Sequence, residues 1–328
     1  MINTELHQHV DVVISWVDGN DPKQAQKIQQ HIDPQFRKHD DVAGATRYTS
    51  VGEIFYSVGS ILRFAPFVRK IFIITDQQNP NLDAFVARNF PDTKTEIEIV
   101  DHRVIFRDYE SVLPIFNSRT IETATFRIPG LSENYVYLND DFFLVRPVSY
   151  NDWYVGDDII AYGAWHSLFL YKLLWLIKPT KNGHKPVGFK DAMIKAAEVF
   201  GQKKQFFHLE HMPHPMKKSV LAKFFETNPA LFNSNIAHKF RSGKQFNTQA
   251  LYYLIMFKQG RAILKSTKDV FLYLKPVNRG DNYINRKLKQ FNSNPSIQFC
   301  CMGSLDMATE ADRTTLLEWL ATTINIKL

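Results

Sequence analysis

Two adjacent carboxylates follow an apolar run near the middle of the chain. Asp140 and Asp141 come directly after Asn139, and the run at 135–138 is rich in residues that favour strands. Apolar side chains fill successive positions of this run, which predicts a strand buried on both faces. Like charges this close raise each other's pKa unless a cation or hydrogen-bond donors share the site. Mg²⁺ held by these carboxylates and by substrate phosphate oxygens would relieve the repulsion. The alternative is an ordinary strand-ending turn, which Asn and Asp also favour.

Three earlier segments have the same form, a buried strand that ends on an acid. The predicted strands are Val10–Val17, Lys70–Thr75, Glu96–Val100 and the run before Asn139. The acids at the ends of the first three are Asp18, Asp76 and Asp101. The predicted helices between them are Gly52–Phe64, Leu82–Phe90 and Ser118–Phe126. This alternation predicts a parallel α/β sheet, in which ligands bind beyond the carboxyl ends of the strands. No dinucleotide fingerprint or P-loop occurs, so any phosphate group must be held in another way.

Helices predominate after Ser149. The predicted helices are Leu168–Ile177, Lys190–Phe200, Ser219–Phe225, Gln249–Phe257 and Arg313–Ile324, and Leu264–Leu274 is a candidate strand. The first of these helices is apolar and flanked by lysines. We predict that it is a core helix in preference to a membrane-surface element.

Three histidines at a spacing of three form a second group that could do chemistry. They are His208, His211 and His214, and Pro213 and Pro215 exclude the regular helix that would align them as metal ligands. We therefore favour a single catalytic or phosphate-binding histidine over a metal cluster. A purely structural histidine is the alternative.

Length and composition indicate a globular chain with a large aromatic core. The 328 residues are 45% hydrophobic and include 26 Phe and 13 Tyr, enough for one large domain or two modest ones. The two cysteines, Cys300 and Cys301, are adjacent, which disfavours a disulfide and fits no zinc spacing. The chain opens on polar residues, without a secretory signal. Leu168–Ile177 is about half the roughly 20 residues that a membrane span needs. We therefore expect a cytoplasmic protein.

The net charge of +7 is concentrated in one block. Between Lys172 and Lys223 there are eleven lysines against Asp191, Glu198 and Glu210, which leaves the rest of the chain close to neutral. Such a block indicates an anionic partner, such as a phosphate-rich glycan, an anionic lipid or nucleic acid, unless it is simply a solvated face. We expect no nucleic-acid partner, because the block lacks arginine and any recognised binding motif.

Several motifs together resemble the Stealth family of sugar-1-phosphate transferases. Residues Asp11–Gly19, which include Trp16 and Asp18, resemble the first conserved region of that family. The second resembles Arg47–Asp76 together with Asn117–Glu122 and Tyr137–Asp141. The third resembles His211-Met-Pro-His214 followed by Arg241. The segment from Cys300 to Asp306 occupies the place of the fourth region but lacks its usual Asn-Asp pair.

The resemblance implies a fold and a reaction. The fold is a Rossmann-like core similar to the A-type glycosyltransferases, with residues 1–150 binding a nucleotide sugar. Residues 151–328 would form a mainly helical, basic region that completes the active site on the acceptor side. The reaction is transfer of a sugar-1-phosphate from a nucleotide-diphosphate sugar, expected to be UDP-linked, to a hydroxyl of an acceptor glycan, with release of nucleoside monophosphate. The setting is capsule or surface polysaccharide synthesis, on an oligosaccharide or lipid-linked glycan, in the cytoplasm or at the inner face of its membrane.

The resemblance also suggests residue roles. Asp140, His211 and Arg241 are the predicted catalytic residues, with the histidine as general base and the arginine bracing a phosphate. Asp141 and Asp140 are the predicted ligands of Mg²⁺ or Mn²⁺. The predicted substrate-binding residues are Trp16, Asp18, Gly19, Arg47, Asn117, Ser118, Glu122 and His214. Two other functions are alternatives: a metal-dependent glycosyltransferase that uses the same acids and releases nucleoside diphosphate, and a glycan- or phosphate-binding module without activity that uses the basic block.

Overall fold

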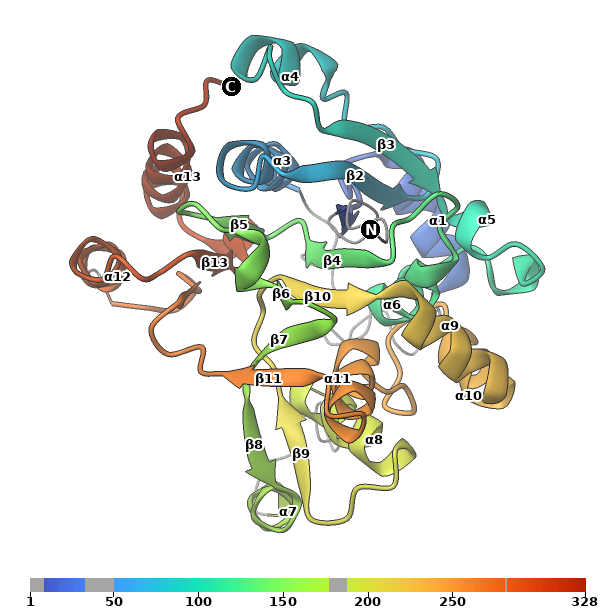
Figure 1. Cartoon of the computed structure of the whole chain (residues 1–328). Coiled ribbons are helices and arrows are strands. Elements are labelled where there is room, and N and C mark those ends of the chain that lie inside the picture. The colour runs from blue at the N-terminus through green and yellow to red at the C-terminus, as the bar shows by residue number, and fades with distance from the viewer. Residues whose placement is uncertain (1–8, 33–49, 177–187, 281) are drawn as a thin grey trace, which may run out of the picture.

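The core of the protein is a five-stranded α/β sheet. The computed structural model describes residues 9–32, 50–176, 188–280 and 282–328. Its main sheet has the order β10-β4-β1-β2-β3 (Figure 1). The strands are β1 (Val10–Ser15), β2 (Val68–Thr75), β3 (Glu96–Asp101), β4 (Asn134–Asn139) and β10 (His214–Lys217). The first four are parallel, as predicted, and β10 joins the edge beside β4 in the antiparallel sense. The predicted Rossmann-like α/β core is therefore confirmed.

Three helices flank this sheet where the sequence predicted them. They are α3 (Glu53–Phe64), α4 (Asp83–Asn89) and α6 (Ser118–Ala124), the last continued by a 3₁₀ turn, Thr125–Arg127. Two further helices were not predicted: the short α5 (His102–Ile105) and α1 (Pro22–His31), which follows the first strand. The start of α1 has two standard signals in the sequence. The Asp21 carboxylate accepts a hydrogen bond from the Lys23 backbone N–H, and proline occupies the first turn.

The later half of the chain is mainly helical, with short strands between the helices. The helices are α7 (Leu168–Leu176), α8 (Phe189–Val199), α9 (Lys218–Thr227), α10 (Pro229–Ile236), α11 (Thr248–Lys258), α12 (Tyr283–Ser293) and α13 (Glu310–Ile324). Three small sheets have the orders β12-β13-β5, β11-β7-β6 and β8-β9. Their strands are β5 (Phe142–Leu144), β6 (Tyr154–Val155), β7 (Asp158–Tyr162), β8 (Ala164–Ser167), β9 (Gln205–His208), β11 (Ala262–Lys265), β12 (Phe271–Leu274) and β13 (Phe299–Met302). The single strand predicted at 264–274 is thus two strands in different sheets.

The prediction that the apolar helix at 168–177 lies in the core is wrong. This helix, α7, lies at one end of the antiparallel strand pair β8–β9, at the bottom of Figure 1. Leu168 is buried, but Phe169 is 73% exposed and Leu174 is 61% exposed. The sequence was ambiguous because the helix is apolar on nearly all sides, so its composition did not identify the buried face. Within the described residues, none of the helices has the length and apolar character to cross a membrane.

Candidate active site

A cavity of about 640 Å³ opens beyond the carboxyl ends of β1 and β4. Its walls come from loops that are far apart in the sequence. The lining residues used below are Trp16, Gln24, Glu53, Asp76, His102, Asn117, Ser118, Asp140, Asp141, Phe189, His211, Arg241, Tyr273, Lys275, Cys301, Gly303 and Asp306. The cavity thus lies where a parallel α/β sheet is expected to bind its ligand.

Asp140 and Asp141 occupy the turn between β4 and β5, in the wall of this cavity. Burial, and then the charges of Asp141 and Glu53, raise the pKa of Asp140 well above its ordinary value. Burial raises the pKa of Asp141 to about 7, although the Cys301 thiol donates to its Oδ2 at 3.6 Å and opposes the shift. Its Oδ1 is buried without a hydrogen-bond partner. The two carboxylates therefore have too little positive charge and too few hydrogen-bond donors nearby to stabilise their ionised forms.

The two carboxylates fit a hard cation that substrate oxygens help to hold. In the part of the chain that the structure describes, no group of three or more His, Cys, Asp or Glu side chains is arranged to bind a metal. Mg²⁺ does not need such a group, since it commonly uses one or two carboxylates together with substrate phosphates and water. The raised pKa values and the unpartnered Oδ1 of Asp141 are what such a site would show without its cation.

His211 faces the same cavity from between aromatic rings. Its ring stacks on Phe189, with centroids 4.2 Å apart, and on Tyr273 at 5.9 Å. Burial, and then the positive charges of Arg241 and Lys275, lower the pKa of His211 to about 4. The ordinary pKa of an imidazole is near ~6.5. The His211 ring is therefore neutral over a wide pH range, but a pKa this low makes it a weak base until a nearby negative charge raises it.

Arg241 is positioned by the residues around Asn117. The Asn117 side chain caps α6 by accepting a hydrogen bond from the Arg119 backbone N–H. Its Nδ2 donates to the carbonyl oxygens of His238 (3.3 Å) and Phe240 (3.1 Å), and to Oε1 of Gln245 (2.7 Å). Asn117 therefore fixes the loop that carries Arg241; it also lines the cavity, and the predicted substrate contact stays a prediction.

Ser118 and Glu122, which follow Asn117 in the chain, both interact with Arg241. The Arg241 guanidinium, which is exposed, donates to the hydroxyl of Ser118 at 3.1 Å. Glu122 is buried behind them, and burial raises its pKa although Arg241 and Arg119 oppose the shift. Ser118 lines the cavity, whereas Glu122 supports it from behind.

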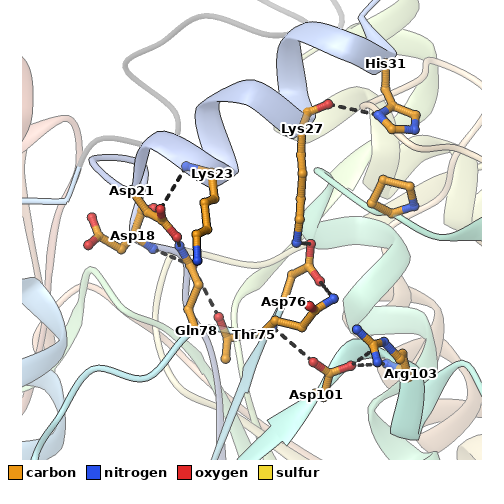
Figure 2. Close-up of polar contacts among 12 residues, drawn as sticks. Asp18, Asp21, Lys23, Lys27, His31, Thr75, Asp76, Gln78, Asp101 and Arg103 are labelled. Carbon is orange, nitrogen blue, oxygen red and sulfur yellow. Dashed lines mark hydrogen bonds and ion pairs between the residues drawn. The ribbon is translucent and has the colours of Figure 1, made fainter.

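The other strand-ending acids have partners within the fold. Asp76 lies 2.9 Å from the ammonium of Lys27, which reaches it from α1 (Figure 2). Asp101 accepts hydrogen bonds from the backbone N–H groups of Gln77 (3.0 Å) and Arg103 (2.9 Å), and Asp18 accepts one from the backbone N–H of Asn20 (2.9 Å). At the end of β4, in contrast, Oδ1 of Asp141 is buried without a hydrogen-bond partner, so the carboxylate pair there is the better candidate for a cation.

The structure brings some predicted substrate-binding residues to the cavity and places others elsewhere. Trp16 lines it, with an indole Nε1 that has no hydrogen-bond partner. Asp18 and Gly19 lie on the next part of the same loop, outside the lining. His214 lies in β10, buried beside Tyr253 with a 3.3 Å ring-nitrogen to hydroxyl contact, and is also outside the lining. Arg47 lies outside the described residues.

Several side chains that line the cavity were not predicted from the sequence. Glu53, at the start of α3, raises the pKa of both Asp140 and Asp141 by its negative charge. Its position after Gly52, at the head of a predicted helix, was the available signal. Lys275 and the aromatic neighbours of His211 gave no signal in the sequence.

The segment in place of the fourth conserved region does contribute to the site. The Met302 backbone N–H donates to the carbonyl of Asp141 at 3.1 Å, beside the Cys301 thiol contact. Asp306 also lines the cavity, and burial raises its pKa. The pairing of β13 with β5 fixes this segment against the carboxylate turn.

Known proteins are similar to this chain over most of its length. Residues 47–161 match the family model for Stealth protein conserved region 2. The capsular polysaccharide phosphotransferase fcs1 of Haemophilus influenzae is 29% identical over 92% of this chain and 79% of its own length. The corresponding cps1A protein of Actinobacillus pleuropneumoniae is 30% identical over 80% of this chain and 69% of its own length. An exopolysaccharide phosphotransferase of Streptomyces coelicolor is 31% identical, and the chain covers half of it.

Solved structures are similar at a lower level. The galactosyltransferase LgtC, crystallised with donor and acceptor sugar analogs, gives a TM-score of 0.45 with 11% identity, over 97% of this chain and 96% of that one. The sequence relationships carry the assignment: the second conserved region matches, and the relative from Actinobacillus pleuropneumoniae is matched over more than two thirds of its length. The chain therefore belongs to the Stealth family.

Proposed function

We propose that this protein transfers a hexose-1-phosphate from a nucleotide-diphosphate sugar to a hydroxyl of an acceptor glycan, in capsule or exopolysaccharide synthesis. The observation that carries the proposal is the composition of the cavity. Asp140 and Asp141 lie in the same cavity as the cations Arg241 and Lys275 and the neutral His211. Phosphoryl transfer depends mainly on positioning and on neutralising charge across both phosphates. The relatives named as polysaccharide phosphotransferases support the same reaction class.

The proposed reaction replaces one P–O bond at the sugar-bearing phosphorus with another. The acceptor oxygen attacks the sugar-bearing phosphorus and forms a new P–O bond. The bond from that phosphorus to the bridging oxygen breaks, and this oxygen leaves with the electron pair as part of the nucleoside monophosphate. His211 takes the hydroxyl proton, and the charge of a bound diphosphate would raise its low pKa toward neutrality. Arg241 and Lys275 brace the phosphate oxygens.

The carboxylate pair has two tasks in this proposal. Asp141, and Asp140 with it, would hold Mg²⁺ or Mn²⁺, which neutralises charge on the diphosphate. Asp140 would also orient the acceptor hydroxyl. Residues 1–150 would hold the nucleotide sugar, expected to be UDP-linked, and residues 151–328 the acceptor. We place this reaction in the cytoplasm, with contact to the inner face of the membrane through the basic block, which suits a lipid-linked glycan acceptor.

The released nucleotide tests the reaction. The purified protein is incubated with a panel of nucleotide sugars, Mg²⁺ and acceptor glycan, and the nucleotide product is identified. Nucleoside monophosphate supports the proposal, whereas nucleoside diphosphate would establish glycosyl transfer. A binding module would consume no donor, and Asp140→Asn would leave its binding intact.

The residue roles have their own test. We expect His211→Ala and Arg241→Ala each to lower turnover at least about a hundredfold. His9→Ala and Arg103→Ala are the matched controls, because both residues are exposed and outside the cavity lining. Near-normal turnover of both cavity variants would overturn the assignment.

A further inference from the structure

The helix α7 exposes an apolar face that the reaction does not use. Phe169 is 73% exposed, Leu170 57%, Leu173 51% and Leu174 61%. At 3.6 residues per turn these four side chains lie within an arc of roughly 140° on one side of the helix. Contiguous apolar exposure of this kind marks an interaction surface more often than a solvated one.

The opposite side of α7 is anchored to the protein, so the apolar face is held outward. Leu168 is buried, and its backbone N–H donates to the carbonyl of Lys204 at 3.0 Å. The Tyr171 hydroxyl donates to the carboxylate of Asp191, on α8, at 3.0 Å. The helix packs against β8 and β9 on this side. Among the described residues, the contacts that fix its orientation are therefore on the side opposite the apolar face.

Several lysines lie on α7 and on the segments beside it. Lys172 projects from α7 itself with its side chain 65% exposed, and Lys203 and Lys204, next to the Leu168 contact, are also exposed. Lys195 is partly exposed. The acids in the same region are Asp191 and Glu198, the second of which lies 3.8 Å from Lys172 and 3.4 Å from Lys195. The region thus has more positive than negative charge beside the apolar face.

We infer that α7 is an interfacial helix that docks the protein on an anionic phospholipid bilayer. An apolar face with Phe and Leu, with lysines beside it, is the pattern that buries side chains among acyl chains while the ammonium groups meet anionic headgroups. A second copy of the chain fits less well, because joining two such faces would bring the lysines beside them together. This inference names the element that makes the membrane contact of the proposed function, but it does not depend on the reaction.

The position of α7 suits a lipid-linked acceptor. Phe189, the first residue of α8, stacks on His211 in the cavity, and Glu198, near the other end of α8, reaches Lys172 of α7. Helix α8 has 11 residues, so it spans roughly 16 Å. A bilayer on the apolar face of α7 would therefore lie about one short helix away from the reacting groups.

Vesicle binding tests the inference. The full chain is sedimented with vesicles of phosphatidylcholine alone or mixed with phosphatidylglycerol. We expect binding to the mixed vesicles only, and a loss of about tenfold or more in the double variant Leu170→Glu/Leu174→Glu. Leu264→Glu is the control, because Leu264 is a 47% exposed apolar residue on β11, away from α7. Since all these side chains are exposed, the variants are expected to fold.

Two further measurements separate the possible outcomes. Nucleotide release with a water-soluble acceptor should be unchanged in the double variant, so failure of the membrane inference and failure of the proposed reaction give different results. Light scattering reports self-association. Vesicle binding that is absent in the parent protein, or equal in parent and double variant, overturns the inference. A dimer that the double variant dissociates, without vesicle binding, would overturn it in favour of a second copy.

Discussion

Asn117→Asp separates two roles that a single side chain performs. As the first residue before α6, Asn117 accepts a hydrogen bond from the Arg119 backbone N–H at 3.1 Å. Aspartate caps helices as well as asparagine does, so this role is kept. The Nδ2 group, however, donates to three acceptors within 238–245, and a carboxylate oxygen in its place would face those oxygens without a proton to share.

The magnitude follows from the contacts. The two hydrogens of Nδ2 are shared among these acceptors, so the loss corresponds to about two hydrogen bonds of about 1 kcal/mol net each, or about 2 kcal/mol. At about 1.4 kcal/mol for each factor of ten, the ratio of correctly placed to displaced loop falls about thirtyfold. Turnover should fall by up to the same factor, because Arg241 is carried by this loop, while the helix cap and the central sheet are retained.

The assay compares turnover and stability in two matched variants. Nucleotide release gives kcat and KM, and urea denaturation gives the free energy of unfolding. Asn247→Asp is the control, because Asn247 is also a buried N-cap, with Oδ1 accepting from the Ala250 backbone N–H at 2.7 Å, but it caps α11 and lies outside the loop. Equal turnover in Asn117→Asp and Asn247→Asp would refute the reasoning.

Three other predictions concern the cavity. In Gly303→Ala the new Cβ would lie 2.8 Å from the Tyr273 hydroxyl, so the ring that stacks on His211 must shift; we expect kcat/KM to fall about tenfold, and a parent-like value would contradict this. With the pKa of Asp141 at about 7, protons compete with the cation below that pH; the apparent Mg²⁺ affinity, measured by titrating activity, should weaken from pH 8 to pH 6, and Asp141→Asn should reduce that dependence to the part that Asp140 contributes. Burial lowers the pKa of His102 from 6.5 to about 4, so the unfolded chain binds more protons between these values; the free energy of unfolding should fall as the pH falls through this window, by up to about 3 kcal/mol, and less in His102→Gln.

The central sheet could be predicted because its signals are local. Strands β1, β2 and β4 contain apolar runs, and α3 has apolar residues at helical spacing, so burial and periodicity agree. The position of the carboxylate pair in a cavity could be anticipated from local sequence as well, because two adjacent charges at the end of a buried strand need compensation. These inferences required no knowledge of distant contacts.

The rest of the site depends on contacts between segments far apart in the sequence. Glu53 and Lys275 become cavity residues only because α3 and the loop after β12 are folded toward the carboxylates. His211 has a low pKa because aromatic rings bury it, which its own sequence neighbours do not indicate. The apolar helix α7 was assigned to the core because composition does not report which side of a helix meets the protein.

The turn after β4 gains its stabilising contacts late, because the chain is synthesised from its N-terminus. β1 and β2 can pair early, but β4 gains its outer neighbour only when β10 has been made. The Cys301 thiol that donates to Asp141 is 160 residues further along the chain. A nascent chain on the ribosome therefore carries the carboxylates long before it can hold them in place. The complete cavity therefore forms late in synthesis, after most of the polypeptide has emerged.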